Sequence, residues 1–270
     1  MFLRKYRFLY LLLACFFFYA LLAIFSLPDV GILKTHYPTL RVQGKSQDIL
    51  VEFSKNRPHD WVRLGGLPAY VPGAVIVSED WSFYQHHGID WNELEAAISE
   101  SLSTLQKPRG ASTLTQQLAK NIFLQRRRSY IRKLREALIA TEIEKHFSKQ
   151  KILETYLNVV EFGPNVYGIN KGAQYFFEKN AAALLPEEAA FLAMILPNPK
   201  ELSVSFRKKQ MTPYAKSRVT QILGKMRKAG YLDEEGAAQA APGRLFIPPV
   251  EPDIIIETNE TDEGSEAPSE

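Results

Sequence analysis

The sequence predicts a mostly α-helical protein, with one N-terminal helix that crosses a membrane and one folded body after it. Three observations predict this fold class. The first is a run of 20 uncharged residues near the N-terminus, and the second is the helical spacing of apolar residues behind capping residues. The third is the scarcity of strands, since residues 71–77 form the one segment that reads as a strand.

Composition limits the classes of function. The chain has 270 residues, 46% of them hydrophobic, which is enough for one sizeable core. Its formal charge of +3 disfavours a nucleic-acid binder with a global basic excess, so no nucleic-acid partner is expected. The single cysteine, Cys15, excludes an intrachain disulfide and any zinc site that needs two cysteine ligands from this chain.

The uncharged run covers residues 8–27 and follows a short basic tail, residues 1–7. A helix of this length spans about 30 Å, the thickness of the hydrocarbon core. A cleaved signal peptide is the alternative, but the run exceeds the apolar part of such a peptide, and no A-x-A site closes it. Because Arg4, Lys5 and Arg7 precede the run, the positive-inside rule puts the N-terminus in the cytoplasm and the body outside.

The region after the anchor divides into three parts. Residues 28–60 contain scattered proline and glycine and are expected to form a stalk, and residues 61–250 form the folded domain. Residues 251–270 hold eight acids and no base, and are expected to be a disordered acidic tail.

The folded domain opens with three expected helices. Asp90 and Glu93 resemble a capping box, and residues 107–110 break the helix that follows. Ser112 is expected to cap a second helix, and residues 130–146 form a third. The residues expected to face inward are Trp91, Leu94, Ile98, Leu102 and Leu105 in the first, Leu114, Leu118 and Ile122 in the second, and Ile131, Leu134 and Leu138 in the third.

Three more helices are expected later. Ser148 caps one of them, and Pro186 and Pro213 each occupy the first position of another, the last of which ends at Gly230. The helix after Ser148 is expected to bury Ile152, Leu153, Tyr156, Leu157 and Val160, and the last helix Val219, Ile222, Leu223 and Met226.

Glu79 and Asp80 directly follow the apolar run at residues 74–77. A carboxylate at the end of an apolar segment is poorly solvated, which raises its pKa toward the range of a general base. The alternative is that the two carboxylates cap the next helix or pair with arginines. The residues themselves leave both interpretations open.

A second polar cluster covers residues 110–121. Ser112, Gln116 and Lys120 fall at i, i+4 and i+8, which is one stripe of a helix. A glycine before a hydroxyl-capped helix also favours anion binding. Many surface helices share these features, so the cluster alone is a weak signal.

The third cluster is a basic run. Residues 120–135 contain seven bases and no acid, and Glu136 closes the run one turn after Arg132. A solvated helix face would mix both signs, whereas a one-sign run between apolar residues suits phosphate groups at a membrane surface. RNA is a competing partner, which the membrane anchor and the outward orientation of the body disfavour.

Four motifs built on these clusters occur in order and resemble the signature set of the family-51 peptidoglycan glycosyltransferases. They are Glu79-Asp80-x-x-Phe83-x-x-His86-x-Gly88, GASTLTQQLAKN at 110–121, Arg132-Lys133-x-x-Glu136, and ILETYLN at 152–158. The resemblance covers about residues 61–230. The chain lacks the K-T-G motif of a penicillin-binding domain, so it resembles the monofunctional members. Glu178 departs from the family pattern, which has a glycine there, and Lys171 departs as well.

This resemblance implies a lysozyme-like glycosyltransferase domain that polymerises lipid II into glycan strands with inversion, in cell-wall biosynthesis. It assigns Glu79 and Glu136 as the catalytic carboxylates, with Glu79 the base and Glu136 orienting the basic cluster or a divalent ion. It implies substrate binding by six residues, Ser112, Gln116, Lys120, Arg128, Arg132 and Lys133. It gives Asp80, Phe83 and His86 a supporting role, and makes Glu154 and Asn158 scaffold.

The resemblance also implies a setting for the enzyme. The expected location is the cytoplasmic (inner) membrane, with a single span and the catalytic domain on the periplasmic side. The expected partners are lipid II and the nascent strand, with cell-wall synthesis or division proteins as further candidates. A divalent cation (Mg²⁺ or Mn²⁺) assists some members, but no ligand set in this sequence demands a metal.

Two rival functions stay open at this point. A muramidase-like lytic enzyme would cleave glycan strands, but protonating a sugar leaving group does not call for seven bases within residues 120–135. A catalytically inactive membrane scaffold for wall synthesis would need none of the chemistry assigned to Glu79.

Overall fold

The structure is a computed structural model that describes residues 6–25, 27–43, 48–104, 110–124, 129–240 and 242–246. The predicted mostly helical class is confirmed, because helices form most of the described chain and the strands are short. The expected acidic tail at 251–270 and the basic residues Arg4 and Lys5 lie outside the described residues.

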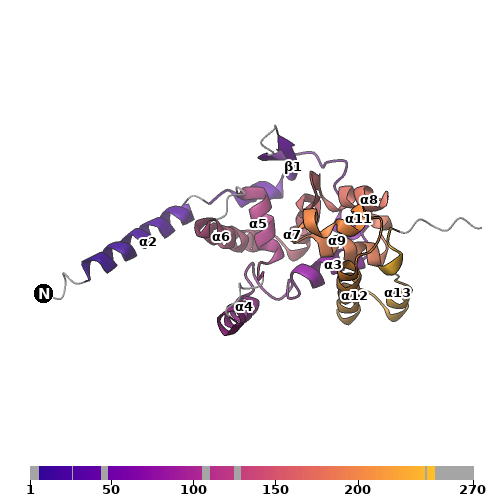
Figure 1. Cartoon of the computed structure of the whole chain (residues 1–270). Coiled ribbons are helices and arrows are strands. Elements are labelled where there is room, and N and C mark those ends of the chain that lie inside the picture. Colours follow the sequence, from indigo (N-terminus) through magenta and orange to yellow (C-terminus); the bar gives the residue numbers. More distant parts are fainter. Residues whose placement is uncertain are drawn as a thin grey trace, which may run out of the picture.

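The first described helix, α2 (Arg7–Phe25), projects from one side of the body (Figure 1). Helices α4 (Trp91–Thr104) and α6 (Tyr130–His146) lie on the same side, and α6 contacts α2. Within the described residues, no helix meets the length and apolarity needed to span a bilayer. The anchor at residues 8–27 therefore stays a prediction.

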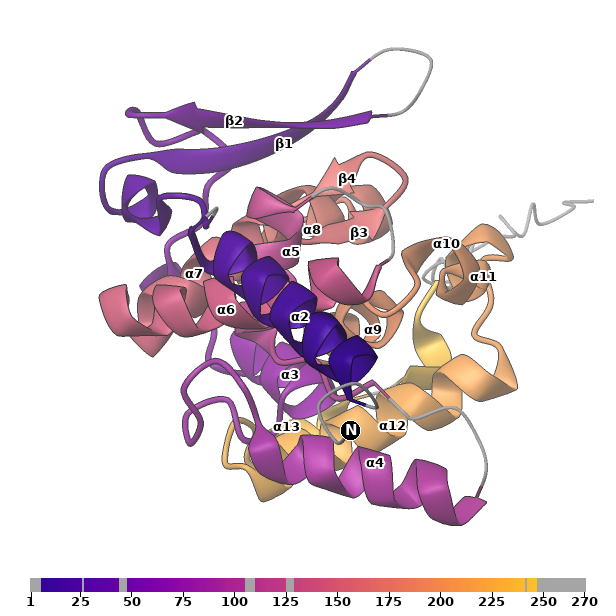
Figure 2. The ribbon, with the colours of Figure 1, turned by 90° about the vertical axis from the view of Figure 1, so that its left-hand side faces the viewer.

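Residues 28–43 and 48–60, the described part of the expected stalk, are folded, which corrects that expectation. They contain the short 3₁₀ helix η1 (Val30–Lys34) and an antiparallel hairpin of β1 (Tyr37–Gln43) and β2 (Asp48–Ser54), in which Leu40 pairs with Val51. Leu40 is buried, and the ring of Phe53 stacks on Phe123 at 6.4 Å. The hairpin folds onto the body because alternate residues of both strands are apolar. Figure 2 shows it at the opposite end of the body from α4.

The centre of the core is helix α3 (Tyr70–Glu79), which corrects the strand expected at residues 71–77. Every residue from Val71 to Val77 is buried, since α3 packs between α9 (Pro186–Ile195) and α12 (Pro213–Lys228). A helix that is buried on all sides has no polar face, so its sequence lacks helical periodicity. Pro72 fits because it lies in the first turn.

Gly73 explains how α3 meets the chain after α12. A Cβ atom at this position would lie 2.4 Å from Cγ of Tyr231, closer than any real contact. The absence of a side chain therefore lets the Tyr231 ring lie directly on the helix backbone.

The predicted helix starts are mostly correct. Ser148 caps α7 (Lys149–Val159) by accepting from the Lys151 N–H, and Pro186 and Pro213 begin α9 and α12. Helix α5 (Leu114–Phe123) begins one residue later than expected, because Thr113 and not Ser112 is its N-cap. The residues expected to be buried in α5, α7 and α12 are buried.

The inward faces expected for α4 and α6 are wrong. In α4, Trp91, Ile98 and Leu102 are 68%, 50% and 74% exposed. Among the described residues of this helix, Ala97 alone is buried. In α6, Ile131 and Leu134 are each 43% exposed, while Glu136, Ile139, Ala140 and Ile143 point inward. A stripe of apolar residues reveals a helix, but the stripe alone does not say whether it meets the core or another apolar environment.

The remaining elements complete the body on the side away from α2. They are the strands β3 (Glu161–Gly163) and β4 (Val166–Tyr167), the helices α8 (Ile169–Phe177), α10 (Pro199–Leu202), α11 (Val204–Arg207) and α13 (Glu234–Gln239), and the 3₁₀ turns η2 (Leu64–Gly66), η3 (Ala181–Ala183) and η4 (Pro242–Arg244). Phe246, near the end of the described chain, stacks on Phe177 of α8 at 5.6 Å. This contact ties the last described residues to the core.

Candidate active site

Glu79 is the last residue of α3, and its carboxylate is held by a side chain from α5. Its Oε2 atom accepts a hydrogen bond from Nε2 of Gln117 at 2.9 Å. Burial raises the pKa of Glu79 above its ordinary value, while the Gln117 hydrogen bond and the positive charges of Lys120 and Arg218 oppose the rise. The carboxylate of Glu79 therefore has an increased proton affinity and still keeps a hydrogen-bond donor.

Asp80 fastens the start of α5 to the end of α3. Its Oδ2 accepts from the Leu114 N–H at 2.8 Å, and its Oδ1 bonds Nε2 of His86 at 2.9 Å. The Gly88 N–H donates to Nδ1 of His86, so that nitrogen is an acceptor and the ring proton lies on Nε2. Both side chains are buried.

Phe83 completes this supporting group. Its side chain is fully buried, and the ammonium of Lys149 lies 4.5 Å from its ring centroid. Asp80, Phe83 and His86 thus lie together behind Glu79 and hold the two helices in place. The structure brings together all three of the residues expected to have this supporting role.

Glu136 organises the basic residues of α6. It is 3% exposed, and it accepts hydrogen bonds from Nη1 of Arg132 at 2.8 Å and from Nζ of Lys133. Lys133 also donates to Oγ of Ser112 at 2.6 Å, which ties α6 to the segment before α5. A buried carboxylate paired with two cations fixes their positions while it leaves a net positive charge.

Lys120 interacts electrostatically with both carboxylates. Its charge is attracted by Glu136 and Glu79 and repelled by Arg132 and Lys133. The residue as a whole is solvent-exposed, yet desolvation of its ammonium lowers the pKa of Lys120, to which repulsion by Arg132 and Lys133 adds. Glu79, Lys120 and the α6 cluster therefore belong to one electrostatic site.

The structure does not bring every expected substrate-binding residue into this site. Gln116 is buried and forms a capping box with Thr113, in which its Oε1 accepts from the Thr113 N–H at 3.1 Å. That amide oxygen stabilises the helix start, and the expected contact of Gln116 with a substrate stays a prediction. Arg128 lies outside the described residues.

Two residues that the sequence did not single out belong to the site. Gln117 is the direct neighbour of Glu79, and Arg218 reaches it electrostatically from α12. Gln117 and Lys120 stand three residues apart on α5, so the polar residues that interact with Glu79 include the expected Lys120 together with Gln117, the neighbour of the expected Gln116. No signal in the sequence links Arg218 to Glu79, because α12 and α3 meet only in the folded chain.

The neighbourhood of Glu136 does not fit a divalent ion. Both of its carboxylate oxygens accept from cations, which leaves no free acidic ligand there. Among the described residues, no group of three or more histidine, cysteine, aspartate or glutamate side chains is arranged to hold a metal.

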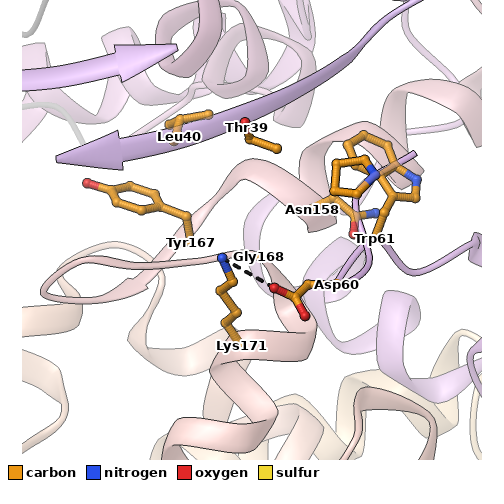
Figure 3. Close-up of a pocket in the computed structure, with 9 residues that line it drawn as sticks. Thr39, Leu40, Asp60, Trp61, Asn158, Tyr167, Gly168 and Lys171 are labelled. Atoms are coloured by element: carbon orange, nitrogen blue, oxygen red, sulfur yellow. Dashed lines mark ion pairs between the residues drawn. The ribbon is translucent and has the colours of Figure 1, made fainter. Parts of the chain in front are cut away.

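Glu154 and Asn158 of α7 form hydrogen bonds with the segment around Trp61 and hold it against this helix. Glu154 accepts from Nε1 of Trp61 at 3.1 Å, and Asn158 exchanges two hydrogen bonds with the backbone of Val62, each 2.8 Å long. These contacts fit the scaffold role that was expected. A small pocket lies on this side, and Asp60 and Lys171, which form an ion pair, are among the residues that line it (Figure 3).

Comparison with known proteins gives this site a family. A model of the transglycosylase family matches residues 46–227. The chain is similar to a biosynthetic peptidoglycan transglycosylase of Acinetobacter baumannii, with 39% identity over 171 residues, which are 61% of this chain and 75% of the relative. It is also similar to the Shewanella amazonensis protein of the same name, with 42% identity over 172 residues, 64% of this chain and 68% of the relative. The chain therefore belongs to the transglycosylase family and is a glycosyltransferase.

Proposed function

We propose that this enzyme polymerises lipid II into peptidoglycan strands, with Glu79 as the general base. The observation that carries the proposal is a half-buried carboxylate that accepts a hydrogen bond from Gln117 and has a raised pKa, and that interacts with the charge of Lys120, which in turn interacts with Arg132 and Lys133. The names of the relatives, biosynthetic peptidoglycan transglycosylases, support the substrate class.

The residue types suit this reaction. A sugar 4-hydroxyl is a poor nucleophile at neutral pH, so a base should remove its proton as the oxygen attacks. In the proposed step that oxygen bonds to the anomeric carbon of the growing strand, whose bond to the diphosphate oxygen breaks with inversion. The proton passes to Glu79, and the bonding electron pair leaves with undecaprenyl diphosphate.

The leaving diphosphate needs neutralisation more than protonation. Lys120, Arg132 and Lys133 supply positive charge on the α6 side of Glu79, and we assign Arg128 to the same group from the sequence. Glu136 positions Arg132 and Lys133 through its ion pairs, which is a reason for a second carboxylate that does not itself take up a proton.

We also propose that residues 8–27 anchor the enzyme in the cytoplasmic membrane, with the body on the outer side. The polyprenyl tail of lipid II leaves a bilayer only at a cost of about 0.8 kcal/mol per methylene. An enzyme tethered to the same surface therefore meets its substrate there. The exposed apolar residues of α4, on the side from which α2 projects, support contact with the membrane surface (Figure 1).

The decisive test is Glu79→Gln in the full chain, assayed with purified lipid II in detergent or vesicles. We expect glycan synthesis to fall by at least about 100-fold, the loss typical of removing a general base. Glu201→Gln is the matched control, since this glutamate is exposed and far from the site in sequence. Undiminished synthesis by Glu79→Gln rejects the assignment, and release of fragments from finished glycan by the unchanged protein supports the lytic alternative.

A further inference from the structure

Tyr156 of α7 is fully buried, and it forms a hydrogen bond with Gln117, the residue that in turn donates a hydrogen bond to Glu79. Its hydroxyl donates to Oε1 of Gln117 at 3.0 Å, and Nε2 of the same amide donates to Oε2 of Glu79 at 2.9 Å. The chain of hydrogen bonds crosses from α7 through α5 to α3. Among the described residues, the Tyr156 hydroxyl forms a hydrogen bond to Gln117 and to no other residue.

A carboxamide has two ends of nearly the same shape but opposite hydrogen-bonding character. In the observed orientation its N–H meets Glu79, which suits an ionised carboxylate. The reversed orientation would place Oε1 against Glu79, which suits only a protonated carboxyl. The orientation of Gln117 thus selects the protonation state of Glu79.

Tyr156 makes the two orientations unequal. If the amide were reversed, Nε2 would donate to the phenol oxygen, and the phenol proton would be left without an acceptor in a fully buried position. The phenol also keeps its proton firmly, because burial and then the charges of Glu79 and Asp80 raise its pKa well above the ordinary value. A permanent donor at this position favours the carbonyl end of the amide.

We propose that Tyr156 is a positioning residue that fixes the Gln117 amide with its N–H toward Glu79 and so keeps Glu79 ionised and ready to accept a proton. This proposal rests on the proposed role of Glu79 as the base. It adds a residue from the ILETYLN motif, otherwise structural, to the control of the site.

The acid limb of the pH dependence of kcat distinguishes a positioning role of Tyr156 from a purely structural one. The charged and titratable groups around Glu79 are Asp80 at the end of its own helix, Lys120 on α5, Tyr156 on α7 and Arg218 on α12. The Gln117 hydrogen bond lowers the pKa of Glu79 against the effect of burial. Its loss should therefore raise the pKa and move the acid limb of kcat to higher pH.

The experiment is Tyr156→Phe in the full chain, with kcat and KM for lipid II measured across pH. We expect KM to change by less than about twofold and the acid limb of kcat to move up by about one pH unit, a tenfold change in proton affinity. Tyr70→Phe is the matched control, because it removes a hydroxyl that donates to the Leu184 carbonyl at 2.7 Å and does not touch α5. The control limb should stay in place.

A second variant keeps the proposal testable if Tyr156→Phe does not fold. Gln117→Met interrupts the same chain of hydrogen bonds at a less buried position, and the acid limb of its kcat should move in the same direction. In the double variant the two shifts should not add, because both act through one hydrogen bond. If Tyr156→Phe does not fold, an unmoved limb in Gln117→Met overturns the proposal.

The outcomes separate this inference from the proposed function. If Glu79→Gln abolishes synthesis but Tyr156→Phe lowers kcat equally at every pH, then Glu79 is the base and Tyr156 is only structural. If Glu79→Gln leaves synthesis intact, the role of Glu79 itself fails, whatever Tyr156 does.

Discussion

At the scale of single residues, Glu79 meets two conflicting requirements. A general base must be ionised, yet its basicity increases as water is withdrawn from it. The structure balances burial, which raises the pKa, against one neutral hydrogen bond from Gln117 and the more distant charges of Lys120 and Arg218. A direct ion pair to Glu79 would lower its basicity, and in the described part of the chain Arg132 and Lys133 pair with Glu136 instead.

This balance has a cost in stability that can be measured. The folded pKa of Glu79 lies above its ordinary value of 4.5, so the folded state binds the proton more tightly than the unfolded state does. At pH values above 4.5 the unfolded state therefore gains more from ionisation of Glu79 than the folded state does. We therefore expect Glu79→Gln to raise the melting temperature near neutral pH.

The difference should shrink as the pH falls from the raised folded pKa toward 4.5, and it should be absent below 4.5, where Glu79 is protonated in both states. Thermal unfolding followed by circular dichroism across this range checks the prediction, with Glu201→Gln as the control. A gain that stays constant with pH would point to packing and not to the charge of Glu79.

At the scale of elements, the end of α8 contains a residue that its conformation does not favour. Glu178 follows the helix with φ of +56°, the left-handed region in which a β-carbon costs roughly 1–2 kcal/mol. This is the position at which the sequence departs from the glycine of the related family. The strain is local, since Glu178 lies away from the site around Glu79.

We expect Glu178→Gly to stabilise the protein by up to about 1 kcal/mol, because relief of strain exceeds the added freedom of glycine in the unfolded chain. Gly230→Ala is the reciprocal control. Gly230 has φ of +75°, and no atom lies within 4 Å of the point that a Cβ would occupy, so alanine there should destabilise through strain alone. Urea unfolding of both variants measures the two effects, and a loss of stability in Glu178→Gly contradicts the prediction.

At the scale of the whole molecule, the features that suit a membrane lie on one side. Helix α2 projects from this side, and α4 and the start of α6 expose apolar side chains there (Figures 1 and 2). The basic residues Arg132 and Lys133 belong to the same α6 helix. The arrangement suits a substrate whose lipid tail stays in the bilayer while its diphosphate reaches the cluster.

Tryptophan fluorescence in vesicles containing brominated phospholipid tests this orientation. Trp91 of α4 is 68% exposed, whereas Trp61 is 7% exposed. We expect Trp91→Phe to remove a large part of the quenching by bromine, and Trp61→Phe to leave it. Equal quenching in Trp91→Phe and the unchanged protein would contradict membrane contact by α4.

Sequence reasoning succeeded where a local signal was sufficient. The cap Ser148 and the first-turn prolines Pro186 and Pro213 mark helix starts, because the orphan N–H groups there demand nearby acceptors or a proline. It failed at α3, whose residues are buried on every side and so show no period. It also did not single out Gln117 as the partner of Glu79, since neighbours on a helix differ in direction by about 100° and only the fold shows which of them faces Glu79.

The sequence by itself determined the helical class, most helix boundaries and the candidates for the reacting groups, because capping, periodicity and a motif are properties of short segments. Only the tertiary structure decided which groups meet. Gln117 finds Glu79, Tyr156 finds Gln117, and the apolar stripes of α4 and α6 turn outward, because packing of distant segments fixes these directions. A single helix cannot specify its neighbour, so the site became complete only when α3, α5 and α7 came together.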